Sequence, residues 1–335
     1  MINKRLFEHY GINTGKNLDI QKVCARPFDT VLIDKQGSCY ACECTAWLPQ
    51  SIGNLQLKPL REIIGSATHQ HLRDSVTDGT YRYCNEHQCP YIRSGLIKET
   101  AVKHVSKLRL AIDDSCNLRC PSCRNQLIFH KEGSPYRLGI RLADKINSWL
   151  TTNENPVQVH IGSDGDPFAS LIYRHFMKNT PRSSNITYSL LTNGLMFKEF
   201  HHSIPHVINN MDKLGVSIDG ASAATYEKLR LGGKWHKIIE ALECIAELKQ
   251  KQNFQFHFHM VVQQDNWHEM ESMLEMAHKY KVDRVYFNKI QDWNTDVDVK
   301  SQTFTELEEF KKLIQRIDQY IETDRIAWNN VTTSV

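Results

Sequence analysis

The chain has 335 residues, of which 41% are hydrophobic and 24% are charged, and its 41 basic and 38 acidic residues leave a net charge of +3. This length suits one large α/β domain, or a core domain with a smaller one. No basic cluster indicates a nucleic-acid partner, and no run of eighteen apolar residues indicates a membrane span. Because the N-terminal residues lack the apolar stretch of a secretory signal, we expect a cytoplasmic protein.

The first hundred residues predict little regular structure beyond a strand-like run at Thr30–Ile33 and turns at Gly37 and Gly53. Six of the ten cysteines fall in this part: Cys24, Cys39, Cys42, Cys44, Cys84 and Cys89. In a cytoplasmic chain, such a group indicates metal binding rather than disulfides.

From about residue 105 the sequence alternates between strand and helix patterns. The predicted strands are Lys107–Ile112, Val157–Ile161, Ile186–Leu191, Lys213–Ile218, Phe254–Val262 and Arg284–Lys289. The predicted helices are Leu138–Leu150, Phe168–Met177, Phe197–Val207, Trp235–Gln250 and Trp267–Tyr280. The alternation predicts parallel βαβ units, and therefore an α/β open sheet or a full or partial barrel. A last helix is predicted after a capping-box pattern at Thr305 and Glu308.

Three cysteines, Cys116, Cys120 and Cys123, follow the first predicted strand of this part within SCNLRCPSCR. Structural zinc sites and iron–sulfur clusters normally take four protein ligands, so the motif is one ligand short. From the residues alone, zinc completed by a remote histidine such as His130 is an alternative to a three-ligand cluster.

Glycine and small polar residues follow the ends of the next predicted strands. They are Gly162–Pro167, Thr192–Gly194 and Ser217–Gly220. Each motif alone is typical of a turn. Since ligands of parallel α/β folds bind at the carboxyl ends of the strands, their placement together predicts a ligand site there.

In this order the motifs resemble those of the radical S-adenosylmethionine (radical SAM) enzymes, over roughly residues 105–290. The three cysteines match the C-x3-C-x2-C motif of that family, and Asp164–Pro167 resembles its G-G-E-P motif with Asp in place of Glu. The segments that resemble later signatures of its peptide-modifying branch are Thr192–Gly194, Ser217–Gly220 and Tyr226–Arg230.

The resemblance implies a partial (β/α)6 barrel in which Cys116, Cys120 and Cys123 hold a 4Fe-4S cluster with one open iron. S-adenosylmethionine would bind that iron and be cleaved by an electron, from a flavodoxin- or ferredoxin-type donor, to methionine and a 5′-deoxyadenosyl radical that abstracts hydrogen from the substrate. The implied SAM-binding residues are Ser122, Asp164, Gly165, Asp166, Asn193, Ser217 and Arg230. Candidates for a general base are Asp113, Asp114, Asp219 and Tyr40, and none is chosen.

The first hundred residues resemble the SPASM cluster domain, which follows the radical core in most relatives. The matching residues are Cys24–Phe28, Gly37, Cys42, Ser51–Leu55, Pro59–Ile63, Cys84 and Cys89. This resemblance implies an auxiliary 4Fe-4S cluster held by Cys24, Cys42, Cys84 and Cys89. Cys39 or Cys44 can replace Cys42 or help to hold a second cluster, and a zinc site is the alternative.

We therefore predict a small irregular iron–sulfur domain at residues 1–100, a radical SAM core at 101–300, and a C-terminal helix and tail at 301–335. The implied function is that of a radical SAM oxidoreductase or maturase, which modifies a peptide or protein oxidatively. Alternatives are a sugar or other small-molecule dehydrogenase or epimerase, and a non-catalytic iron–sulfur redox module. Neither a nucleic acid nor a membrane is expected as a partner.

Three further side chains are predicted to be structural. His257 and His259 alternate with apolar residues on one strand, so their rings share a face, and hydrogen-bonded structural histidines are favoured there over substrate contacts. Cys244 is predicted to be a small core residue of its helix.

Overall fold

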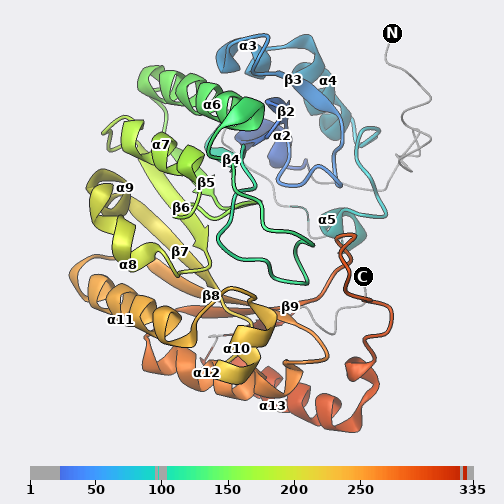
Figure 1. Ribbon diagram of the computed structural model, residues 1–335. Helices are drawn as coiled ribbons and strands as arrows, with labels where there is room; N and C mark the ends of the chain where they lie inside the picture. The colour runs from blue at the N-terminus through green and yellow to red at the C-terminus, as the bar shows by residue number, and fades with distance from the viewer. Residues whose placement is uncertain (1–22, 95–96, 98–103, 325–326, 330–335) are drawn as a thin grey trace. The chain divides into compact units, whose positions relative to one another are not determined.

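The computed structural model describes residues 23–94, 97, 104–324 and 327–329 (Figure 1). Contacts between Cα atoms divide the chain into two compact units. The first comprises Met1–Asp113, Lys131–Asp164 and His175–Thr187, and the second Asp114–His130, Gly165–Arg174 and Tyr188–Val335. In the described part of the chain, no helix is long and apolar enough to cross a membrane. The last residues of the predicted tail, 330–335, lie outside the described residues.

The described strands of the first unit form a sheet in the order β5-β4-β1-β2-β3. β1 is parallel to β4 and β4 to β5, whereas β2 is antiparallel to β1 and β3. The strands are β1 (Thr30–Asp34), β2 (Ser38–Tyr40), β3 (Ser51–Asn54), β4 (Lys107–Ala111) and β5 (Val157–Ile161). The helices are α2 (Arg26–Asp29), α3 (Leu60–Ile64), α4 (Ala67–Thr77), α5 (Pro90–Ser94) and α6 (Gly133–Thr152).

β1 joins the N-terminal segment to the first strand of the βα repeats. Val31 and Ile33 are fully buried, as expected for β-branched residues of a central strand. Beside them, the Lys107 ammonium lies 3.0 Å from the carboxylate of Asp29, the residue before β1. The sequence predicts the β1 strand but not its partner, and the N-terminal segment is more regular than expected.

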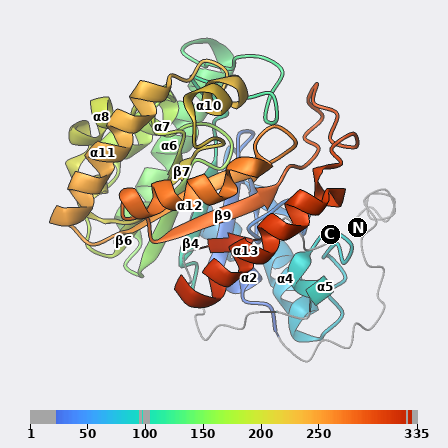
Figure 2. The same cartoon turned by 90° about the horizontal axis from the view of Figure 1, so that it is seen from below.

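In the second unit, the strands from β6 to β10 follow one another in parallel order. Figure 1 shows β6 to β9 in this order, and Figure 2 shows the same cartoon from below. They are β6 (Ile186–Thr192), β7 (Met211–Ser217), β8 (Gln255–Val262), β9 (Arg284–Lys289) and β10 (Ala327–Asn329). One α-helix, α7 (Leu171–Asn179), precedes β6. The α-helices between these strands are α8 (Phe197–Phe200), α9 (Pro205–Asn209), α10 (Ala223–Leu229), α11 (Trp235–Lys251), α12 (Met270–Lys279) and α13 (Glu308–Asp324). Short 3-10 turns are η1 (His201–Ser203), η2 (Trp267–Glu269) and η3 (Phe304–Glu306). α7 begins in the second unit and ends in the first, and β6 begins in the first unit and ends in the second. Both elements therefore lie where the chain passes from one unit to the other.

The six strands from β4 to β9 alternate with helices, which is the order of a partial (β/α)6 barrel. The predicted α/β fold class is therefore confirmed. On α12, Met270 and Met273 are fully buried in the core.

Two helix predictions are wrong in detail. The single helix expected at Phe197–Val207 is divided into α8, η1 and α9, because Pro205 has no N–H to donate and disfavours helical backbone at Ile204. The capping box at Thr305 is not formed, since Thr305 lies inside η3 and α13 begins at Glu308.

Gly220, after β7, occupies a position that no side chain fits. A Cβ atom there would lie 2.6 Å from the backbone nitrogen of Tyr226, an atom that cannot rotate away. We therefore expect Gly220→Ala to lower the free energy of unfolding by about 1–3 kcal/mol. Gly65→Ala is the control, since its added Cβ would meet its nearest atom at 3.7 Å. Urea denaturation of both variants measures the difference, and equal stabilities would contradict the expectation.

Candidate functional site

Cys116, Cys120 and Cys123 lie on one loop of the second unit, residues 114–130, called here the cysteine loop. Cys120 is buried, Cys116 is half-buried and Cys123 is exposed. The backbone N–H of Cys123 donates to the carbonyl of Cys120 at 2.9 Å, which forms a turn between the last two thiols. Burial and the charge of Asp166 raise the pKa of Cys116 to about 11. A metal that binds these thiols must therefore displace protons from them.

Asp166 holds the strand-end motifs together. Its Oδ2 accepts hydrogen bonds from Thr192 Oγ1 at 2.7 Å and from the Asn193 N–H at 2.8 Å. Its Oδ1 accepts the N–H groups of Phe168 and Ala169, at 3.0 and 2.9 Å. The buried carboxylate is thus fully engaged within the protein, and what the structure assigns to it is the positioning of neighbouring segments.

Two predicted site residues approach the sulfur atoms of the cysteine loop. Asn193 Nδ2 donates to Asn117 Oδ1 at 2.8 Å and lies 3.6 Å from Cys116 Sγ. An Arg230 guanidinium nitrogen lies 3.8 Å from Cys120 Sγ. Both side chains offer N–H donors to sulfur, which is the contact that stabilises thiolate in a cluster site.

A buried ion pair fixes Arg230. Its Nε lies 2.7 Å from Asp219 Oδ2, and Asp219 is fully buried. Burial by itself lowers the pKa of Arg230, but the negative charge of Asp219 outweighs this effect and raises it. Asp219, one of the candidates for a general base, is thus the partner of the Arg230 cation.

The other predicted SAM-binding residues are Ser122, Asp164, Gly165 and Ser217. Ser217 is half-buried at the end of β7, and Ser122 is half-buried between the second and third cysteines. Gly165 is half-buried and starts a segment of the second unit, whereas the exposed Asp164 ends a segment of the first. Their contacts with SAM stay predictions.

His130, the alternative zinc ligand, is engaged elsewhere. Its Nε2 donates to Asp114 Oδ1 at 2.8 Å, and its backbone N–H donates to Ser115 Oγ. The same loop therefore uses this histidine to hold its own two ends.

His257 and His259 lie on one face of β8, as predicted. The His259 ring stacks on Tyr286 with centroids 4.8 Å apart, and the His257 ring meets the same tyrosine edge-on at 5.3 Å. Gly215, on the neighbouring strand, leaves room for His259, since a Cβ there would lie 3.0 Å from that imidazole. Burial, with the nearby charge of Lys213, lowers the pKa of His257 to about 3 and of His259 to about 4.

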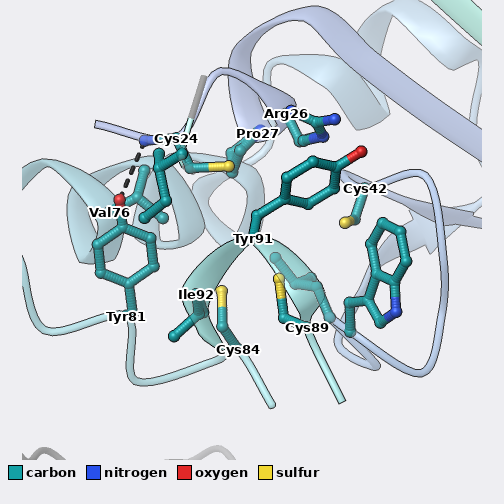
Figure 3. Close-up of a pocket in the computed structure, with 13 residues that line it drawn as sticks. Cys24, Arg26, Pro27, Cys42, Val76, Tyr81, Cys84, Cys89, Tyr91 and Ile92 are labelled. Carbon is teal, nitrogen blue, oxygen red and sulfur yellow. Dashed lines mark hydrogen bonds between the residues drawn. The ribbon is translucent and has the colours of Figure 1, made fainter. Parts of the chain in front are cut away.

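Four cysteines of the first unit line a single pocket of about 380 Å³, part of which is open to solvent. They are Cys24, Cys42, Cys84 and Cys89, and we call this the thiol pocket. In Figure 3 the four sulfur atoms surround the same space. The segments that supply them are held close, for example by Tyr81, whose hydroxyl accepts the Cys24 N–H at 3.1 Å.

The other two N-terminal cysteines do not line the thiol pocket. Cys39 is fully buried on β2 and its thiol donates weakly to the carbonyl of Gly37 at 3.7 Å. Burial raises the pKa of Cys39 to about 12. Cys44 is half-buried near Cys89. In the second unit, Cys244 is half-buried on α11, so the prediction that it is a core residue is wrong.

The sequence did not single out the rest of the pocket wall. Besides the thiols, this wall includes Arg26, Trp47, Tyr81 and Tyr91. The one signal was for Arg26, which lies within the Cys24–Phe28 stretch that resembles the SPASM domain, and no sequence signal pointed to Trp47, Tyr81 or Tyr91.

Residues 112–277 match the Radical SAM superfamily, a range that contains the cysteine loop and the segments that Asp166 holds. The chain belongs to this superfamily. Enzymes of this superfamily use S-adenosylmethionine and a 4Fe-4S cluster. Three thiols on one loop, with Asn193 and Arg230 as donors to sulfur, fit such a cluster.

Individual relatives are distant from this radical SAM enzyme. A probable GTP 3′,8-cyclase of Methanococcus maripaludis is 25% identical over 148 residues, which cover 44% of this chain and 47% of that protein. A GTP 3′,8-cyclase of Synechocystis is 22% identical over 215 residues, or 64% of this chain and 63% of that protein. The crystal structure of Streptococcus suis SuiB bound to the precursor peptide SuiA has a TM-score of 0.49 at 12% identity, covering 78% of this chain and 53% of that one. The chain thus spans about half the length of the first curated relatives that it matches.

Replacing Asp166 tests its positioning role. In Asp166→Asn, one acceptor oxygen becomes an amide that faces N–H or O–H donors, so Thr192 and Asn193 lose a partner. We expect the rate of 5′-deoxyadenosine formation from SAM to fall at least tenfold, as a loss of about 1.4 kcal/mol would give. Asp265→Asn is the control, because Asp265 forms only an exposed pair with Lys228. Equal rates for the two variants would show that the carboxylate is dispensable.

The buried histidines make stability depend on pH. The pKa of His257 is about 3 when folded and ordinarily about 6.5, so the unfolded chain binds the proton first and stability falls as the pH drops below 6.5. Between pH 7.5 and 5, we expect the wild type to lose about 2 kcal/mol more than His257→Asn. Urea denaturation at both pH values measures this loss. The exposed His71→Asn variant is the control, and a matching pH response of the two variants would contradict the assignment.

Proposed function

We propose that this radical SAM enzyme modifies a peptide or protein substrate by a net oxidation, with a second 4Fe-4S cluster in the thiol pocket. The observation that carries the proposal is the thiol pocket itself, which collects Cys24, Cys42, Cys84 and Cys89 from separate segments of the chain. A SPASM-like domain within residues 1–100, a radical core at 101–300 and a C-terminal helix at 301–335 are part of the proposal.

The resemblance of residues 1–100 to the SPASM cluster domain supports a cluster over zinc in the thiol pocket. Four thiols that line one pocket make up the complete protein ligand set of such a cluster. Burial raises the pKa of Cys42 to about 12 and that of Cys84 well above its usual range, so an assembled cluster would have to displace their protons.

The cysteine loop would hold the SAM-binding cluster through Cys116, Cys120 and Cys123. Bound SAM supplies the 5′-deoxyadenosyl radical after one-electron reduction. Asn193 and Arg230 would donate to the cluster sulfurs. Ser122, Asp164, Gly165 and Ser217 would complete the edge that receives SAM, and Asp166 would hold that edge in position. The exposed side of the loop at Cys123 offers an external donor of the flavodoxin or ferredoxin type a short path for the electron.

A net oxidation needs an electron acceptor. The substrate first loses a hydrogen atom to the radical, which becomes 5′-deoxyadenosine, and then loses a proton and an electron. The four thiols of the first unit would hold the group that takes this electron.

Exposed apolar side chains on two adjoining loops support a peptide or protein substrate. Leu127 and Phe129 on the cysteine loop are 60% and 45% exposed, and Trp293, after β9, is 65% exposed. The backbone N–H of Asp296 donates to Asn125 Oδ1 at 2.9 Å, which ties the two loops together. Large exposed apolar side chains are typical of surfaces that bind other chains.

A deuterium-transfer assay tests the proposal. Anaerobically reconstituted enzyme is incubated with SAM, dithionite and deuterated peptides encoded by neighbouring genes. We expect deuterium in 5′-deoxyadenosine and a product two hydrogens lighter than the peptide. SAM cleavage without transfer from any peptide would count against a peptide substrate.

A second candidate is a nucleotide or other small-molecule substrate. It is favoured by the curated relatives that are named GTP 3′,8-cyclases, at 25% and 22% identity. Deuterium transfer from labelled GTP in the same assay would support this candidate over the first.

The two neighbouring cysteines Cys39 and Cys42 give a matched test of the thiol pocket. We expect Cys42→Ala to lose the iron of one cluster, because Cys42 lines the pocket, and Cys39→Ala to retain it. Iron and sulfide quantification of the reconstituted proteins measures the difference. Full iron content in Cys42→Ala would remove Cys42 from the ligand set.

A further inference from the structure

Arg26 brings a buried positive charge to the thiol pocket. It is the first residue of α2 and lines the pocket together with the four thiols (Figure 3). Its side chain is only 9% exposed. A buried guanidinium is costly unless a negative group or hydrogen-bond acceptors compensate for it, so its partners indicate what it serves.

The described residues satisfy Arg26 only in part. Its guanidinium carbon lies 4.1 Å from the centroid of the Tyr91 ring, and one terminal nitrogen lies 3.5 Å from Glu43 Oε2. Its Nε is buried and has no hydrogen-bond partner among the described residues. The planar guanidinium of Arg26 is thus fixed by an aromatic face and a carboxylate, while its Nε–H is left for another acceptor.

The charge of Arg26 acts on the thiols of the pocket. Burial raises the pKa of both Cys24 and Cys89, and the guanidinium opposes this effect at each of them. Cys42 in turn is close enough to act on Arg26. The cation therefore favours thiolate at several positions around the same space.

Neighbouring arginines of the first unit are engaged elsewhere. Arg73 Nε donates to the carbonyl of Pro27 at 3.0 Å, and its guanidinium lies 5.5 Å from the Phe28 ring. Arg82 pairs with Asp78 at 2.8 Å on the surface. Neither lines the thiol pocket.

We propose that Arg26 is a redox-tuning residue of the thiol pocket, which donates its Nε–H to a sulfur of the cluster and raises the reduction potential of that cluster. This inference rests on the proposed auxiliary cluster. A 4Fe-4S cluster with four thiolates is negatively charged, and reduction adds one more negative charge. A buried cation beside it stabilises the reduced form more than the oxidised one, and net charge and hydrogen bonds to sulfur are among the factors that set cluster potentials. The substrate electron can then be accepted more readily at this site.

The negative charge of Glu43 opposes the effect of Arg26 on the reduction potential. Its side chain is 24% exposed and its carboxylate faces the same guanidinium. We therefore expect substitutions of Arg26 and Glu43 to shift the reduction potential in opposite directions, because removing the cation and removing the anion change the local charge in opposite directions.

Redox titration of the isolated auxiliary cluster tests the inference. The full-length Cys116→Ala/Cys120→Ala/Cys123→Ala protein serves as the parent, since it would retain only the cluster of the thiol pocket. Anaerobic titration followed by electron paramagnetic resonance gives its midpoint potential. We expect Arg26→Gln to shift the potential to a more negative value, Arg26→Lys to shift it less, and Glu43→Gln to shift it to a more positive value. Arg61→Gln, which removes an exposed charge on α3, should leave it unchanged.

Each outcome separates the inference from the proposed function. A parent that binds no iron beyond the level of a Cys24→Ala/Cys42→Ala control would overturn the auxiliary cluster itself. If the parent holds a full cluster and Arg26→Gln leaves the midpoint potential of that cluster unchanged, the role of Arg26 alone is overturned. If Arg26→Gln does not bind the cluster, the Glu43→Gln variant becomes the test of the inference. A midpoint potential that stays unchanged or becomes more negative in Glu43→Gln refutes the inference.

Discussion

A carboxylate buried among four hydrogen-bond donors, that of Asp166, sets the geometry of the radical SAM site. It accepts N–H groups of its own loop, the hydroxyl of Thr192 and the N–H of Asn193. Its own backbone N–H donates to the carbonyl of Ser115 at 2.9 Å, next to the first cysteine. Asn193 then reaches Cys116 Sγ, so one side chain determines where a strand end and the cysteine loop meet. Such a buried anion is stable because every acceptor position is filled.

The two thiol sets differ in how the protein surrounds them. The three cysteines of the cysteine loop range from buried to exposed. N–H donors of Leu118 and Asn193 approach the sulfur of Cys116, and one of Arg230 approaches that of Cys120. The four cysteines of the thiol pocket lie against aromatic rings and Arg26. An accessible site suits a cluster that must bind SAM and receive electrons, and an enclosed one suits a cluster whose ligands are all protein.

Much of the fold could be predicted, because hydrophobic patterns report local structure. The strands at Val157–Ile161 and Arg284–Lys289 have the predicted bounds, since alternation and turn residues define both ends. The pairing of β1 with β4 could not be predicted, because Thr30–Asp34 carries no local signal for its partner. The sequence favoured Cys42 as a ligand but left Cys39 open as its replacement, whereas strand β2 places Cys39 in the apolar core and away from the pocket. The role of Asp166 was also hidden, since a motif gives the residue type and not the donors that face it.

The parallel pairing of β1 with β4 would couple metal loading of the N-terminal segment, if the proposed cluster binds there, to the folding of the sheet. Cys24 lies a few residues before β1, and β1 lies beside the first strand of the βα repeats. A group bound by the thiol pocket would favour the folded state of these segments over the unfolded one, so its binding free energy would stabilise the sheet as well. In a cell short of iron, the unfilled chain would open between these two strands more often and be degraded sooner. The abundance of the enzyme would then report the iron supply before any catalysis takes place.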